Sequence, residues 1–80
     1  MKVVGAYCQD MDFAARVGEK LKTARKQRGL SQARLAAAVG VDPRTIVRIE
    51  QGEHQPGAFL FGRICAELLV SADDVLQDAE

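Results

Sequence analysis

The sequence predicts an all-α fold, with five helices between residues 13 and 77 and no sheet. Three observations support this prediction: apolar residues recur at helical spacing, N-capping residues precede these segments, and glycines follow several of them. The chain has 80 residues and a hydrophobic content of 48%, which is enough for one compact core but not for two. We therefore expect one small domain, near the lower size limit at which burial alone stabilises a fold.

The first helix is expected from Phe13 to about Arg28. Asp12 is suited to cap its start, and Gly29 is suited to end it. Its buried stripe at helical spacing consists of Phe13, Val17, Leu21 and Ala24. Residues 1–11 precede this helix as a tail or an arm. As an arm the segment would either form a strand with another copy of the chain or lie along DNA, because a lone strand has no partner here.

The middle of the chain predicts two short helices joined by a tight turn. Ser31 is suited to cap a helix over 32–39, and Gly40 can adopt the positive φ that often ends a helix. Asp42 is suited to cap a second helix over 43–50. Two helices joined by a turn of about four residues that contains a glycine form a helix-turn-helix.

The second of these helices presents a face suited to reading base pairs. Ile46 and Ile49 point inward, and the opposite side carries two arginines, a hydroxyl group and a branched apolar side chain. Arginine can bond guanine O6 and N7 together, and valine can contact a thymine methyl group. We therefore predict base contacts from Pro43, Arg44, Thr45, Val47 and Arg48. Two arginines on a helix are more often a solvated surface, but the preceding turn and helix favour DNA binding.

The stretch GLSQARLAAAVGVDPRTIVRIEQGEHQP resembles the Cro/XRE-like helix-turn-helix family of phage repressors and small bacterial regulators. The shared pattern is Leu-Ser-Gln, a helix, Gly-Val, a helix with isoleucine at two core positions, and Glu-x-Gly. The similarity extends from about Phe13 to Val75. It implies a compact five-helix, lambda-repressor-like domain over 12–77, followed by an acidic end at 78–80. It also implies that the helix over 32–39 braces across the DNA backbone while the next helix reads the major groove.

The sequence and this resemblance also predict residues that contact the DNA backbone and an ion pair that holds the reading helix. Ser31, Gln32 and Arg34 are expected to contact DNA phosphates from the start of the first motif helix. The resemblance also implies a partly buried ion pair between Arg25 and Glu50. This pair would be structural, because it would tie the first helix of the domain to the reading helix.

The last third of the chain predicts two more helices and a surface for self-association. Pro56 precedes the fourth helix, and Ser71 caps a short fifth helix through Val75 and Leu76. The inward stripe of the fourth helix is Phe61, Ile64, Cys65 and Leu68. Apolar residues that are expected on the surface of the C-terminal helices favour a two-fold dimer. The predicted interface residues are Phe59, Leu60, Leu69 and Val75, although Val75 is equally suited to complete the core of the monomer.

The net charge of zero conceals a strong asymmetry along the chain. Residues 20–48 contain eight Lys or Arg and one acid, whereas residues 49–80 contain one Arg and seven acids. A basic segment of this kind is typical of a surface that binds nucleic acid. Like charges would also oppose self-association through the basic segment.

Other classes of function find little support in the sequence. Cys8, Cys65 and His54 lack metal-ligand spacing, and no catalytic or phosphate-binding motif occurs, so we predict no metal, cofactor or enzymatic activity. No segment has the apolar length of a targeting signal or membrane span, which favours free thiols in a reducing cytoplasm.

The sequence therefore predicts a homodimeric repressor of transcription that binds double-stranded DNA at a palindromic operator. The alternative is an antitoxin-like module whose C-terminal helices neutralise a partner protein, a toxin or another protein. The two alternatives are compatible, because antitoxins of this family often bind their own operators.

Overall fold

The computed structural model describes residues 2–79, and it describes side chains from residue 13 to residue 77. Its helices are α1 (Lys2–Gln27), α2 (Gln32–Val39), α3 (Pro43–Glu50), α4 (Ala58–Leu68) and α5 (Ala72–Ala79). No strand occurs within residues 2–79. The predicted all-α fold with five helices is therefore confirmed.

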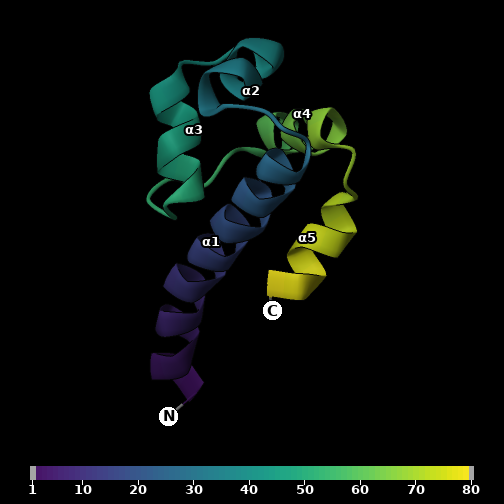
Figure 1. The fold of residues 1–80 in the computed structure, drawn as a ribbon. Coiled ribbons are helices and arrows are strands. Elements are labelled where there is room, and N and C mark those ends of the chain that lie inside the picture. The colour runs from purple at the N-terminus through teal and green to yellow at the C-terminus, as the bar shows by residue number, and fades with distance from the viewer. Residues whose placement is uncertain (1, 80) are drawn as a thin grey trace.

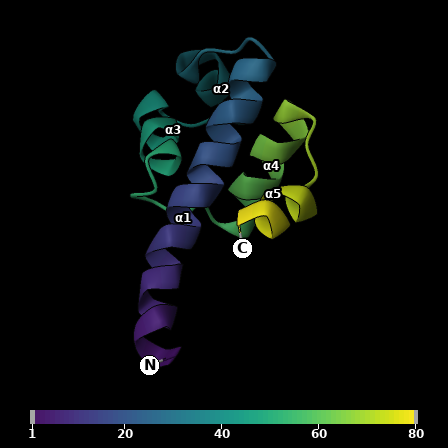
Figure 2. The ribbon, with the colours of Figure 1, turned by 60° about the horizontal axis from the view of Figure 1, so that its bottom comes forward.

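Helix α1 is the axis around which the other helices are arranged (Figure 1). Helices α2 and α3 pack together, with α3 beside α1 and α2 near the C-terminal end of α1; α4 and α5 lie on the other side of α1 from α3, as the turned view also shows (Figure 2), and α4 also packs on α2. The N-terminal turns of α1 extend beyond this body. The molecule is consequently elongated, with dimensions of 42 × 22 × 21 Å.

Helix α1 begins earlier than the sequence predicts. It starts at Lys2 rather than at Phe13, so the predicted N-cap at Asp12 and the suggested strand within residues 1–11 are wrong for the part of the segment that the structure describes. No proline precedes Phe13, and a continuing helix satisfies the amide groups there with main-chain carbonyls instead of a side-chain cap. A contact of this extension with DNA or with another copy remains a prediction.

Helices α2 and α3 begin and end where the sequence predicts. The Ser31 hydroxyl accepts a hydrogen bond from the Arg34 N–H at 3.0 Å. The Asp42 carboxylate accepts one from the Arg44 N–H at 2.8 Å. Gly40 ends α2 with a φ of +82°, a value that glycine adopts at no steric cost. Local capping chemistry therefore defines both helices of the motif.

The core is apolar and draws on every helix. Its buried residues are Val17, Leu21, Ala24, Leu35, Ala36, Val39, Ile46, Ile49, Ile64, Cys65, Leu68 and Val75. The stripes predicted from helical spacing supply most of this set, with Phe13 and Phe61 packed half-buried at its edge. Val75 is buried because α5 packs along α1, so its prediction as an interface residue is wrong.

Candidate nucleic-acid interface

Helix α3 separates an apolar side from a charged side. Ile46 and Ile49 are buried in the core. Arg44 and Arg48, one helical turn apart, are exposed on the opposite side. All residues predicted to contact bases are exposed or half-buried on this one helix: Pro43, Arg44, Thr45, Val47 and Arg48. The face therefore has the charge and shape that a major-groove contact requires.

The turn between α2 and α3 fixes the angle between the two helices. The N–H groups of Gly40 and Val41 both donate to the Ala36 carbonyl oxygen, at 2.8 and 2.9 Å. Val41 also packs half-buried against the core. Because the turn is both hydrogen-bonded and anchored, it holds the N-terminal end of α3 in a defined position.

The residues predicted to contact the DNA backbone surround the N-terminal end of α2. Ser31 and Arg34 are exposed, whereas Gln32 is half-buried. The Ser31 hydroxyl is already engaged as the α2 cap, and the Gln32 amide donates to Glu50 at 3.0 Å. Contacts of these residues with phosphates remain predictions, and the Gln32–Glu50 bond was not expected from the sequence.

The expected ion pair between Arg25 and Glu50 is present and buried. Arg25 Nε donates to Glu50 Oε2 at 2.6 Å, and Arg25 Nη2 donates to Oε1 at 3.2 Å. The two side chains are only 8% and 3% exposed. Arg25 Nη1 also donates to the Leu30 carbonyl oxygen at 2.7 Å. Together with Gln32, these bonds connect α1, the turn after it, α2 and the last residue of α3.

Two glycines let the end of α3 approach α1 closely. A Cβ atom on Gly18 would lie 2.6 Å from the Glu50 carbonyl oxygen and would also overlap the Ile49 carbonyl oxygen. Gly52, which has a φ of +80°, would place a Cβ atom 2.8 Å from Ala15 Cα. This role of Gly18 was not expected from the sequence. A glycine inside a helical pattern is the only signal it gives, because glycine is unfavourable there unless packing requires it.

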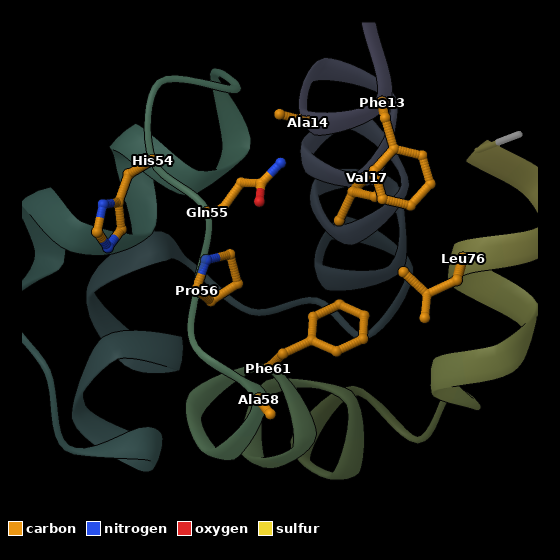
Figure 3. Close-up of a pocket in the computed structure, with 9 residues that line it drawn as sticks. All are labelled: Phe13, Ala14, Val17, His54, Gln55, Pro56, Ala58, Phe61 and Leu76. Carbon is orange, nitrogen blue, oxygen red and sulfur yellow. The ribbon is translucent and has the colours of Figure 1, made fainter. Parts of the chain in front are cut away.

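A small apolar cleft lies between α1, the loop that joins α3 to α4, and helices α4 and α5 (Figure 3). Its volume is about 130 Å³. Phe13 and Val17 from α1, Phe61 from α4 and Leu76 from α5 point toward one another, whereas the His54 imidazole lies at the outer edge. Most of the described residues that line the cleft are apolar, so it offers mainly apolar contact. Sequence patterns did not reveal it, because four separate segments form its wall.

The residues predicted for self-association differ in their exposure. Phe59 and Leu69 are 79% and 73% exposed, but Leu60 packs half-buried against the core. The Arg63 guanidinium lies 5.9 Å from the centre of the Phe59 ring, within the range of a cation–π contact. Leu69 ends α4 with a φ of +59°, a conformation that is costly for a residue with a Cβ atom. Of the residues predicted for self-association, Phe59 and Leu69 are thus the exposed ones.

The remaining polar groups form neither a metal site nor a reactive centre in the part of the chain that the structure describes. No cluster of three His, Cys, Asp or Glu side chains occurs among residues 13–77. Desolvation raises the pKa of the buried Cys65 thiol above its usual value, so this thiol stays protonated and inert near neutral pH. The side chain of Cys8 lies outside the described residues. None of the described helices combines the length and apolar character needed to cross a membrane.

The chain is similar to several known proteins in sequence and in fold. Residues 21–75 match the family model described as Helix-turn-helix. A Bacillus subtilis (strain 168) protein described as the uncharacterized HTH-type transcriptional regulator YgzD is 36% identical over 56 residues, which are 70% of this chain and 85% of that protein. The clp gene regulator ClgR from C. glutamicum gives a TM-score of 0.79 at 28% identity, over 84% of this chain and 86% of that one. The restriction-modification controller protein C.AhdI from Aeromonas hydrophila shares the fold, with a TM-score of 0.73 at 22% identity over 78% and 94% of the two chains.

Proposed function

Since the chain belongs to the helix-turn-helix family of DNA-binding transcriptional regulators, which are not enzymes, we propose that it is a repressor that binds a palindromic operator as a homodimer. Its place of action would be the cytoplasm, where it would associate with the nucleoid through DNA. The proposal has three parts: base reading by α3, backbone contact by α2, and dimerisation through α4.

The observation that carries the proposal is the exposed pair of arginines on α3. Arg44 and Arg48 stand on the side of the helix opposite the buried Ile46 and Ile49. An α-helix with its side chains is about 10–12 Å across, which fits the B-DNA major groove of about 12 Å width. Each guanidinium can bond two acceptors on one guanine, which makes the pair suited to select a sequence and not only to hold the backbone.

Contacts with phosphates would come from the start of α2 and the basic segment around it. Arg34 is exposed one turn after the α2 cap. The segment from residue 20 to residue 48 holds eight of the eleven basic residues of the chain. Such charge supplies affinity that is independent of sequence and falls steeply as salt rises.

Dimerisation follows from the demands of site selection together with the exposed apolar residues of α4. One reading helix contacts only a few base pairs, too few to discriminate among roughly 10⁶–10⁹ competing genomic sites. Two copies related by a two-fold axis would read half-sites about 34 Å apart on one face of the duplex. Phe59 and Leu69, near the two ends of α4, supply exposed apolar area for that contact. Leu60, half-buried beside them, would contribute at the edge.

The same exposed residues support a second candidate function. A partner protein, such as a toxin, could cover Phe59 and Leu69 in place of a second copy. Sedimentation of the isolated protein at micromolar concentration separates the two functions. A dimer supports self-association, whereas a monomer that binds only as one half-site favours the partner-binding function.

Selection of bound duplexes from a random library tests the proposal as a whole. We expect enrichment of a two-fold symmetric sequence whose half-sites are one helical turn apart. Leu69→Glu should then weaken both dimerisation and protection of the full site, while Gln77→Glu, at an exposed position on α5, should leave both unchanged. Enrichment of no sequence, or of one without symmetry, would contradict the proposal.

A further inference from the structure

The side chain of Gln32 bonds to the protein instead of pointing into solvent. It occupies the first position of α2, where a contact with DNA phosphate is predicted, but its Nε2 donates to Glu50 Oε1 at 3.0 Å. A carboxylate can only accept hydrogen bonds, so the group that faces Glu50 must be the amide NH₂ of Gln32. The bond therefore links the start of α2 to the end of α3.

Glu50 Oε1 accepts two hydrogen bonds, and the one from Gln32 is the shorter. Oε2 accepts from Arg25 Nε at 2.6 Å, but Oε1 accepts from Arg25 only at 3.2 Å. With the Glu50 side chain 3% exposed, water has little access to replace a lost donor. Without Gln32, Oε1 would keep one long bond, and the carboxylate would be held from α1 alone.

The position of Glu50 makes this link important for the reading helix. Glu50 is the last residue of α3, and its backbone rests on α1 at Gly18. The α2–α3 turn already holds the N-terminal end of α3, so the links from α1 and α2 to Glu50 fix the other end of this helix. In a helix about 12 Å long, a rotation of roughly 10° about the N-terminal end moves the Glu50 end by about 2 Å, and Arg48 lies only two residues from that end. A displacement of that size is enough to misalign a bidentate contact with a base.

We propose that Gln32 is a positioning residue, which fixes the orientation of α3 by holding Glu50 from α2. This inference rests on the proposed function, because it concerns the helix that would read the bases. It assigns Gln32 to sequence discrimination, whereas a residue that contacts only phosphate would contribute equally to all sequences.

The test compares Gln32→Met with Arg34→Met on the selected duplex and on a scrambled duplex. Methionine keeps the length and helix propensity of glutamine but cannot donate to Glu50. We expect Gln32→Met to lower the ratio of the two affinities by about three- to tenfold, a partial loss of one bidentate base contact. Arg34→Met should weaken both duplexes by the same factor and leave the ratio unchanged. Equal weakening of both duplexes by Gln32→Met, or no effect on either, would overturn the proposal.

Arg48→Ala in the same assay separates this inference from the proposed function. If Arg48→Ala lowers the affinity ratio and Gln32→Met does not, α3 reads bases and only the role of Gln32 is wrong. If Arg48→Ala lowers the affinity for both duplexes equally, α3 does not read bases, whatever the result for Gln32→Met.

A measurement on the unaltered protein keeps the proposal testable if Gln32→Met does not fold. The Gln32 side-chain amide should show one slowly exchanging proton by nuclear magnetic resonance, and this proton should stay protected in the complex with the selected duplex. Protection that is absent in the free protein, or that disappears on DNA binding, would show that the bond to Glu50 does not hold α3 during reading.

Discussion

The α2–α3 unit and the α4–α5 end pack against the same helix, α1, but through different interactions. In the α2–α3 unit, side chains cap both helices, and a buried polar network joins Arg25, Gln32 and Glu50. At the α4–α5 end, the Ser71 hydroxyl accepts from the Asp73 N–H at 3.2 Å, but α4 has no side-chain hydrogen bond at its N-cap, Gly57, and it ends on Leu69 with a positive φ. Hydrogen bonds and ion pairs depend on direction, whereas apolar packing does not. Directional bonds therefore hold the α2–α3 unit in a defined orientation, whereas the α4–α5 end presents exposed apolar side chains.

The largest expected effect comes from breaking the buried network on one side. Arg25→Met leaves the Glu50 carboxylate without its ionic partner, so the free energy of unfolding should fall by about 3–5 kcal/mol. A domain of this size has only about 4–12 kcal/mol of stability in total. Urea denaturation measures the loss. The double variant Arg25→Met with Glu50→Met should recover most of it, and a double variant as unstable as the single one would show that the buried charge is not the cause.

A smaller effect is expected where α3 rests on α1. Gly18→Ala introduces a Cβ atom into the carbonyl oxygens of Ile49 and Glu50, which should cost about 1–3 kcal/mol of stability. Gly62→Ala is the matched control, because it lies within α4 and its Cβ atom would meet nothing within 4 Å. This second change should stabilise the fold by about 0.5–1 kcal/mol. Thermal unfolding of both variants measures the difference, and equal effects would contradict the close packing at Gly18.

The smallest stability effect is expected at the C-terminal end of α4. Leu69→Gly removes the steric cost of the left-handed conformation and should stabilise the monomer by up to about 1 kcal/mol. The same change removes an exposed apolar side chain and should weaken self-association. Unfolding at low concentration and sedimentation at high concentration measure the two effects. If dimerisation were unchanged in this variant, the interface would not include Leu69.

The contrast between the two regions also explains what the sequence could predict. The bounds of α2 and α3 follow from caps and a glycine that act within a few residues, so local patterns predicted them correctly. The start of α1 has no such signal, and the prediction placed it 11 residues too late. Val75 fits the helical period of either a core or an interface residue, and only the packing of α5 on α1 decides between them.

Local sequence patterns likewise predicted one part of the candidate site, whereas tertiary contacts determine the rest. The exposed face of α3 follows from helical spacing, since burial of Ile46 and Ile49 places Arg44 and Arg48 outside. The bond from Gln32 to Glu50 joins residues 18 positions apart, and no sequence pattern encodes its geometry. The apolar cleft depends on four segments at once, and it was missed for the same reason.

Base reading by α3 is the central claim, and one binding measurement tests it most directly. Arg48→Ala and Arg34→Ala are compared with the unaltered protein on the selected and scrambled duplexes over a range of salt concentrations. Arg48→Ala should cost about 1–3 kcal/mol on the selected duplex and much less on the scrambled one. Arg34→Ala should weaken both by the same factor and reduce the salt slope by about 1. Equal losses on the two duplexes for Arg48→Ala would contradict the placement of α3 in the major groove.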